Sequence, residues 1–284
     1  MSYQFKPNQY YRMPTHFGPS LGPRQGLDGR RFACVDSPDD TMLLATFKAD
    51  KTQLEKLMPP GFTVREPCTI TFDFSFITNI EWLAGRGYNT FGVSVPATYN
   101  GEKDTVHGDL LLVLWENKAD PILTGREDLG FSKIYCEIPE PQIIGNDVIC
   151  RASWDGFEFA SLKISGLTEI SPDEYAKQSA TTSADQPVSE GTLHYKYIPK
   201  TGCPGESDSE YAALTPGDWP NMKLDLVKQT DTAVLTFNSA TWEQLPTLVH
   251  IVNTLSALTL GDCTQALMTK TRGGNDLSSQ RILR

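Results

Sequence analysis

Short strand-like segments dominate this chain and follow one another with little helix between them. Residues 69–78 are the clearest case, because Ile70, Phe72, Phe74 and Phe76 alternate with polar residues, the period-two pattern of a half-buried strand. Further strands are expected at residues 41–47, 91–99, 110–115, 133–138, 147–152, 156–164, 193–199, 222–228, 232–237 and 258–269. Consecutive strands joined by short turns argue against a doubly wound parallel sheet. The pattern therefore predicts an α+β, β-rich fold built on a closed or strongly curved, antiparallel-rich sheet.

Helical signals are few and lie between the strands. Asp50 is placed to cap a helix over residues 51–58, which Pro59 and Pro60 end, and apolar residues at helical spacing predict another helix over 248–258. Short helices are expected near 125–129 and 172–178, and the glycine-rich residues 82–90 are expected to form a loop. We interpret residues 1–40 as an N-terminal arm, 41–270 as a single domain and 271–284 as a C-terminal tail.

Charge and composition exclude several classes of partner. The net charge is −10 and no basic run is present, so nucleic acid and anionic lipid surfaces are not expected to bind. The chain begins with polar and aromatic residues rather than the apolar stretch of a signal peptide, and no segment approaches about 18 consecutive apolar residues. The six cysteines form no C-x-x-C pair, which predicts reduced core thiols and a cytoplasmic protein.

Common cofactor and metal motifs are missing from the sequence. It contains no phosphate-binding loop, no dinucleotide-binding glycine fingerprint and no nucleophile elbow. The four histidines are scattered and form no H-x-H or H-E-x-x-H pattern. We therefore expect neither a cofactor nor a metal ion, and a small molecule as the partner.

Lys133 is the strongest candidate for a reactive side chain. Leu129, Phe131 and Ile134 surround it in the sequence and offer its ammonium group no partner. Burial in apolar surroundings disfavours the charged form of lysine, and a neutral amine can attack a carbonyl carbon and form a Schiff base. The alternative is a lysine whose stem packs on the core while its charged end reaches water. The local sequence leaves both interpretations open.

Two other polar residues have two interpretations each. Asp73 faces away from Phe72 and Phe74, so it is either a pocket carboxylate or a solvated surface residue, depending on whether that face lines an interior. His107 precedes an apolar strand and is either an acid or base of a pocket or a surface histidine.

The segment around Lys133 resembles the acetoacetate decarboxylase family. In that family a Gly-Arg-Glu triplet is followed by an aromatic residue, a small residue or proline, and the lysine that forms the Schiff base. Gly125-Arg126-Glu127 and Phe131-Ser132-Lys133 match this spacing. The resemblance extends over the sequences FKAD at 47–50, VPATYNG at 95–101, GDL at 108–110 and HYKYIP at 194–199, and thus over residues 40–269. It implies a β-cone with a few peripheral helices.

This chain departs from the family pattern at several positions. The decarboxylases have a second lysine directly after the nucleophile, where this chain has Ile134. A substrate-binding arginine of the family aligns with Asp40, and a loop glutamate aligns with Thr90. A core-strand glutamate aligns with Asp73, which keeps a carboxylate there. The missing arginine and glutamate argue against acetoacetate itself as the substrate.

The resemblance implies an imine-forming lyase of a keto acid or another carbonyl-bearing metabolite, with decarboxylation of a β-keto acid as the first choice and an aldol or dehydration step as a variant. Lys133 is the expected nucleophile and Asp73 the expected proton shuttle, and Arg126 and Glu127 are expected to pair structurally beside the lysine loop. Substrate contacts are expected from Thr90, Phe131, Phe72, His107, Arg126 and Glu127. The resemblance also suggests a homo-oligomer, and a role in secondary metabolism is expected. A non-covalent cyclase or isomerase, or a small-molecule binding protein, is the alternative.

Overall fold

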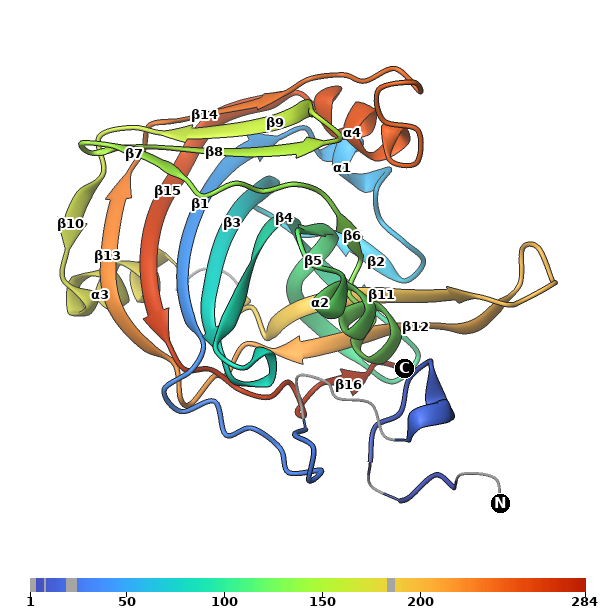
Figure 1. Cartoon of the computed structure of the whole chain (residues 1–284). Helices are drawn as coiled ribbons and strands as arrows, with labels where there is room; N and C mark the ends of the chain where they lie inside the picture. Colours follow the sequence, from blue (N-terminus) through green and yellow to red (C-terminus); the bar gives the residue numbers. More distant parts are fainter. Residues whose placement is uncertain (1–3, 8, 19–24, 183–186) are drawn as a thin grey trace.

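The computed structural model describes residues 4–7, 9–18, 25–182 and 187–284. The chain forms two β-sheets with a few short helices at their margins, and the strands of the larger sheet curve strongly (Figure 1). This agrees with the predicted β-rich, antiparallel-rich curved sheet.

The larger sheet has 12 strands among the described residues, in the order β10-β13-β15-β1-β3-β4-β5-β11-β12-β16, with β2 beside β4 and β6 beside β5. These strands are β1 (Asp39–Ala49), β2 (Phe62–Val64), β3 (Thr69–Ile80), β4 (Arg86–Asn100), β5 (Thr105–Glu116), β6 (Lys133–Tyr135), β10 (Thr168–Ile170), β11 (Gly191–Pro199), β12 (Ser207–Pro216), β13 (Lys223–Thr230), β15 (Leu260–Arg272) and β16 (Arg281–Ile282). The smaller sheet has the order β14-β9-β8-β7 and consists of β7 (Gln142–Ile144), β8 (Asp147–Trp154), β9 (Phe157–Ile164) and β14 (Ala233–Phe237).

Most neighbouring strands are antiparallel, but β5 is parallel to both β6 and β11. Parallel neighbours need a crossover connection rather than a tight turn. Between β5 and β6 this connection is helix α2 (Ala119–Thr124), which continues into the π-helical turn η3 (Gly125–Leu129). The crossover returns the chain to the edge of β5, and so places Lys133, the first residue of β6, beside that strand.

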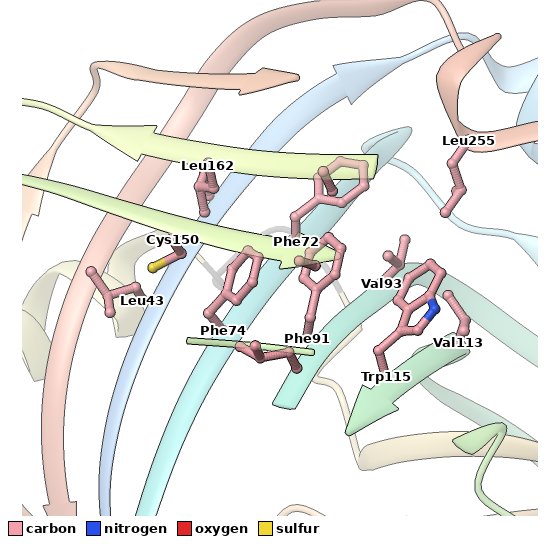
Figure 2. Packing of buried hydrophobic residues seen from close by; sticks show 14 of the residues in the cluster. Leu43, Phe72, Phe74, Phe91, Val93, Val113, Trp115, Cys150, Leu162 and Leu255 are labelled. Atoms are coloured by element: carbon pink, nitrogen blue, oxygen red, sulfur yellow. The ribbon is translucent and has the colours of Figure 1, made fainter. Parts of the chain in front are cut away.

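The hydrophobic core lies between the two sheets. Alternation along β3 and β4 sends Phe72, Phe74 and Phe91 to this side, where they meet Cys150 and Leu162 of the smaller sheet (Figure 2). The aromatic strand predicted from the sequence is therefore a core strand. The opposite face of the larger sheet carries Asp73 and the other polar residues of β3, and we call it the polar face.

Replacement of Phe74 by alanine is expected to lower the free energy of unfolding by about 3–5 kcal/mol, because removal of a fully buried phenyl ring leaves a cavity. Phe74 is inaccessible to solvent and stacks on Phe91 with ring centroids 4.2 Å apart. Urea denaturation measures the change. The matched control is Val188→Ala, at an exposed position, with an expected change below about 0.5 kcal/mol. Equal effects of the two substitutions would contradict this assignment of the core.

The remaining helices are short and peripheral: η1 (Thr15–Phe17), α1 (Lys51–Glu55), η2 (Glu81–Leu83), α3 (Pro172–Thr182) and α4 (Val249–Ser256). The side chain of Asp50 accepts a hydrogen bond from the Gln53 backbone N–H at 2.9 Å and caps α1, as predicted. The predicted loop at 82–90 was wrong beyond its first residues, because β4 begins at Arg86 and pairs with β3. Among the described residues, no helix has the length and apolar character needed to span a bilayer.

The two predicted terminal segments contact the sheet. The end of the tail pairs with β12 as strand β16, and Leu283 is buried. Near the start of the chain, Arg12 donates a hydrogen bond to Asp128 Oδ2 at 2.7 Å and another to the Thr124 hydroxyl. Both termini thus pack near the crossover that precedes Lys133. The division into arm, domain and tail remains a prediction.

Candidate active site

Lys133 is buried on the polar face of the larger sheet. In the parallel register of β5 and β6 it pairs with Leu114, and only 7% of its surface is exposed. Its neighbour Ile134 points the other way and packs against the core. Neighbouring residues of a strand face opposite sides, so the isoleucine that replaces the family's second lysine does not share the face of Lys133.

A carboxylate that the sequence analysis did not identify lies against Lys133. Glu116, the last residue of β5, is completely buried, and its Oε1 is 2.8 Å from Lys133 Nζ. The same ammonium group donates a hydrogen bond to the Pro121 carbonyl oxygen at 3.3 Å. The expected lysine without a charged partner is therefore corrected: the site contains a buried ion pair, and apolar surroundings alone do not determine where its proton resides.

Two opposing effects act on the pKa of the Glu116 carboxyl group. Burial raises the pKa of its carboxyl group above the ordinary value, and the positive charge of Lys133 opposes that rise. Its Oε2 has no hydrogen-bond partner among the described residues. A buried carboxylate whose charge depends on one neighbouring ammonium is well suited to exchange a proton with it.

The side chain of Lys133 occupies space that exists only because residue 125 is glycine. A methyl group on Gly125 would lie 2.4 Å from Lys133 Cδ, 2.5 Å from Cε and 2.8 Å from Nζ. Gly125 belongs to the Gly-Arg-Glu triplet singled out in the sequence, and its helical backbone dihedrals (φ −62°, ψ −40°) suit any residue. The glycine is therefore required by the close approach of the lysine and not by backbone conformation.

Arg126 and Glu127 each take part in a hydrogen bond to the backbone or side chain of another residue, and they do not form an ion pair with each other. Arg126 Nη1 donates a hydrogen bond to the Lys133 carbonyl oxygen at 2.8 Å, and Lys196 Nζ donates to the Glu127 carbonyl oxygen at 2.6 Å. No ion pair between Arg126 and Glu127 occurs in the described part of the chain, so the expected pairing between them was wrong. Their substrate contacts remain predictions.

The groove beside β6 lies on the side of the strand away from Lys133. It is lined by Leu57, Arg126, Ser132, Ile134 and His250, among others, and Lys133 is not one of its lining residues. Arg126 therefore faces a different space from the amine that the sequence analysis grouped it with.

Phe131 and a buried histidine form the aromatic side of the site. The ring of Phe131 lies 5.1 Å from Lys133 Nζ and 4.1 Å from the imidazole of His194 on β11, measured to the centroids. His194 is inaccessible to solvent, and its Nε2 is 2.9 Å from the Thr215 hydroxyl oxygen. Phe131 thus lies beside the lysine, and its contact with a substrate remains a prediction.

Asp73 and Lys133 lie in one row that crosses four strands of the polar face. Strand pairing places Asp73 opposite Gly92, Gly92 opposite Leu114, and Leu114 beside Lys133. With about 4.8 Å between strands, the two Cα atoms are separated by roughly 14 Å along the sheet. A Cβ atom on Gly92 would lie 2.6 Å from Asp73 Oδ1, so the carboxylate leans over this glycine towards the lysine.

A second row beside the first carries Thr90. Ser75 lies opposite Thr90, and Thr90 lies opposite Glu116. The Ser75 hydroxyl donates a hydrogen bond to Asp40 Oδ2 at 3.2 Å. Thr90 is therefore a buried strand residue next to the ion pair, and Asp40, which aligns with the family's arginine, contributes a carboxylate to the same face.

The acids of the polar face are raised in pKa. Burial, followed by the negative charge of Asp40, raises the pKa of Asp73 to about 7, and burial raises the pKa of Asp40 to about 6. The polar face thus combines Asp40, Asp73 and Glu116 with the ammonium group of Lys133. The alternatives for Asp73 resolve in favour of a partly buried carboxylate, and its role as a proton shuttle remains a prediction.

The contribution of Asp73 to stability is expected to fall as the pH rises from about 4 to 7, because the unfolded chain loses the Asp73 proton near its ordinary pKa of about 3.9 while the folded protein retains it up to about 7. Asp73→Asn removes this contribution. The difference between these two pKa values corresponds to about 4 kcal/mol, and partial exposure reduces the expected gain to about 1–2 kcal/mol at pH 8, with none near pH 4. Urea denaturation at both pH values measures it, with the exposed Asp208→Asn as control. A variant no more stable than the native protein at pH 8 would contradict the burial of this charge.

Two predicted substrate contacts lie away from the lysine. Phe72 is fully buried in the core on the opposite face of the sheet, beside Phe47. His107 is on β5, seven residues before Leu114, and its Nδ1 is 2.9 Å from the Thr98 hydroxyl oxygen. The structure therefore does not bring either residue into the cluster around Lys133.

Sequence reasoning missed Glu116 and His194. Glu116 is the last residue of β5, and the predicted strand stopped one residue earlier, at Trp115. The apolar run 110–115 carries no period-two signal, so only the strand pairing places Glu116 on the face of Lys133. No signal exists for His194 either, because its position next to Phe131 depends on the β5–β11 pairing.

Within the described residues, no group of three or more His, Cys, Asp or Glu side chains is arranged to hold a metal ion.

The fold and site define an α+β protein with a large curved sheet whose polar face surrounds a buried lysine–carboxylate pair. The chain belongs to the acetoacetate decarboxylase (ADC) family, whose sequence profile matches residues 12–272.

Solved structures share the fold at low sequence identity. An acetoacetate decarboxylase is 13% identical, with 87% of this chain and 88% of that chain covered and a TM-score of 0.64. An acetoacetate decarboxylase from Legionella pneumophila is 15% identical, with coverages of 90% and 91% and a TM-score of 0.61. The enduracididine biosynthesis enzyme MppR is 12% identical, with coverages of 87% and 86% and a TM-score of 0.58. No curated protein matches this chain in sequence.

Proposed function

We propose that this protein is an imine-forming lyase that acts on a carbonyl-bearing metabolite, with decarboxylation of a β-keto acid as its reaction. The observation that carries the proposal is the buried contact of 2.8 Å between Lys133 Nζ and Glu116 Oε1. It provides a nucleophile and a proton acceptor at one point of an ADC-family fold.

The ion pair supplies the protons for imine formation. Glu116 takes one proton from the ammonium group of Lys133, and the resulting amine adds its lone pair to the carbonyl carbon while the C=O π electrons move to oxygen. A second proton passes from nitrogen to that oxygen and gives a carbinolamine. Glu116 then returns its proton to the hydroxyl group, which leaves as water. The net change converts an ammonium group and a ketone into a protonated imine and water, with the charge conserved.

The protonated imine then acts as an electron sink. The bond to the carboxylate breaks, CO2 leaves, and the electron pair forms an enamine. Asp73 is the proposed source of the proton that the enamine carbon takes up, because a carboxyl with a pKa of about 7 is partly protonated at neutral pH. Water releases the ketone product and restores the lysine.

An aldol or dehydration reaction is a variant of the same chemistry. One solved structure of MppR contains the condensation product of pyruvate and imidazole 4-carboxaldehyde. The fold of that protein is similar to the one described here, and this similarity supports carbon–carbon bond formation as the variant. The same enamine intermediate would serve, with an aldehyde in place of the proton.

The second candidate is a non-covalent cyclase, isomerase or binding protein on the same fold. The observation that favours it is the ion pair itself, since an ammonium group that retains its proton binds anionic oxygen and does not attack carbon. In this case Lys133 would orient a ligand through charge, and no covalent intermediate would form.

Trapping with borohydride decides between the two candidates. The full chain is incubated with acetoacetate, pyruvate and a panel of larger β-keto acids, reduced, digested and mapped by mass spectrometry. Imine formation predicts a reduced adduct on Lys133 with at least one compound. Bound ligand without an adduct on Lys133 for any compound would favour the non-covalent candidate.

The cellular location, oligomeric state and metabolic role of the protein are also proposals. We propose a cytoplasmic homo-oligomer that acts in secondary metabolism, supported by the reduced cysteines and by the similarity to an enzyme of enduracididine biosynthesis. Light scattering of the purified chain tests the oligomeric state, and a monomer would contradict it.

A further inference from the structure

His194 is a buried titratable residue that the mechanism above does not use. It lies on β11 and is inaccessible to solvent, with its ring 4.1 Å from that of Phe131. The charge of Lys133 contributes to the pKa of this imidazole, so the two side chains are close enough to interact. Buried polar atoms normally have hydrogen-bond partners, so a partner is expected for each ring nitrogen of His194.

The imidazole ring of His194 is uncharged at neutral pH. Burial, followed by the positive charge of Lys133, lowers the pKa of His194 to about 3. It therefore neither stores nor supplies a proton during turnover. A neutral imidazole has one N–H donor and one bare nitrogen acceptor, and the identity of the donor depends on the partners of the ring.

A chain of hydrogen bonds indicates which nitrogen carries the hydrogen. The side-chain amide of Gln280 donates to the Leu129 carbonyl oxygen at 2.7 Å and to the Thr215 hydroxyl oxygen at 3.2 Å. Thr215 is buried and accepts from Gln280, and among the described residues the acceptor found for its own hydroxyl hydrogen is His194 Nε2, 2.9 Å away. Nε2 is then the acceptor, and the hydrogen of the neutral ring is on Nδ1.

The Nδ1 atom is buried and has no hydrogen-bond partner in the described part of the chain. An unpaired buried N–H donor loses its hydrogen bonds to water on folding, which is unfavourable unless a ligand replaces them. The ring lies beside Phe131, whose own ring is 5.1 Å from Lys133 Nζ. Because Phe131 lies beside both side chains, the unpaired Nδ1–H donor is part of the same cluster as the amine of Lys133.

We propose that His194 donates a hydrogen bond from Nδ1–H to the oxygen of the carbonyl group that Lys133 attacks. The bond strengthens as the C=O π electrons move to oxygen, so it favours carbinolamine formation, and no proton leaves the imidazole. Gln280 and Thr215 act as positioning residues that hold the ring in this tautomer. The inference rests on the proposed function, and it assigns a binding element for the substrate oxygen.

The tautomer is measured directly in the native chain. Nitrogen-15 NMR of protein labelled at histidine distinguishes a protonated from a bare ring nitrogen, and loss of the signal in a His194→Asn variant assigns it among the four histidines. We expect His194 to carry its hydrogen on Nδ1, to show no titration between pH 5 and 9, and to shift its Nδ1–H signal when a carbonyl compound binds beside Lys133 with its oxygen still in place. A hydrogen on Nε2, or titration in this range, would overturn the inference.

A matched pair of variants tests the effect on the reaction. Asparagine and leucine are similar in size, and the asparagine amide keeps an N–H donor near the position of Nδ1. His194→Leu is expected to lower the rate of borohydride-trapped adduct on Lys133 about 100-fold, and His194→Asn to stay within about tenfold of the native rate. Equal rates for both variants would indicate a purely structural role.

The outcomes separate this inference from the proposed function. If the native chain forms no adduct on Lys133 with any carbonyl compound, the proposed function fails and this inference fails with it. If the adduct forms but binding of the carbonyl compound leaves the His194 signal unchanged, only the inference about His194 is overturned. The NMR measurement is made on the native chain and needs only His194→Asn for its assignment, so it remains decisive if His194→Leu does not fold.

Discussion

Lys133→Met is expected to abolish the borohydride-trapped adduct while the chain remains folded. Methionine approximates the length of the lysine stem without an amine. The variant also leaves Glu116 buried without its counter-charge, and breaking a buried pair in this way lowers stability by about 3–5 kcal/mol. Mass spectrometry of the trapped protein and urea denaturation measure the two effects.

The stability loss in this variant has a definite pH dependence. Without Lys133, the pKa of Glu116 rises further above the ordinary glutamate value of about 4.3, because only burial remains. The unfolded chain then releases the proton at a lower pH than the folded chain, so stability falls as the pH rises above about 4.3. The double variant Lys133→Met/Glu116→Gln carries no such charge and is expected to recover most of the loss at pH 8.

Lys196→Met is the matched control for the chemistry. Lys196 is as deeply buried as Lys133, with 7% of its surface exposed, but its amine donates to a backbone carbonyl and has no carboxylate partner among the described residues. We expect this variant to form the adduct as the native chain does. An adduct that maps to Lys196, or one that persists in Lys133→Met, would refute Lys133 as the nucleophile.

Gly125→Ala is expected to slow adduct formation about 100-fold by displacing the amine. The added methyl group would lie 2.4 Å from Lys133 Cδ, and a shift of about 1 Å in a reacting group lowers rates by this order. Crowding is also expected to lower the free energy of unfolding by about 1–3 kcal/mol. Trapping rates and urea denaturation provide the readouts.

Two controls isolate the steric cause. Gly274→Ala adds a methyl group whose nearest contact, in Trp219, is 3.5 Å away, and no effect on trapping is expected. When Lys133 is shortened to alanine, Gly125→Ala should become neutral or stabilising by up to about 1 kcal/mol, because the helical backbone at this position favours alanine over glycine. A native trapping rate in Gly125→Ala would show that the lysine tolerates the contact and would contradict the tight site.

The strand pattern of the sequence predicted much of the fold. Alternation of Phe72, Phe74 and Phe76 with polar residues identified β3 as a strand with one apolar and one polar face, and the structure pairs it with β1 and β4. Alternation of side chains is a local property of the extended backbone, so it can be recognised in the sequence without knowledge of the tertiary structure. The family resemblance added the lysine and its Gly-Arg-Glu triplet.

The pattern does not say what covers each face. The sequence analysis placed Phe72 among the substrate contacts, but the smaller sheet covers that face and makes Phe72 part of the core. Similarly, His107 and Lys133 both belong near β5, and only the register of the strands separates them by seven residues along it. Such outcomes depend on which distant segments pack together.

The sequence by itself determined the strand-rich character of this chain and, through the family resemblance, singled out Lys133 and the Gly-Arg-Glu triplet before it, because each is a property of one short segment. Only the tertiary structure decided that Glu116 accompanies Lys133 and that His194 lies beside Phe131. These contacts arise from the parallel pairing of β5 with β6 and β11, across crossovers whose geometry no local pattern encodes.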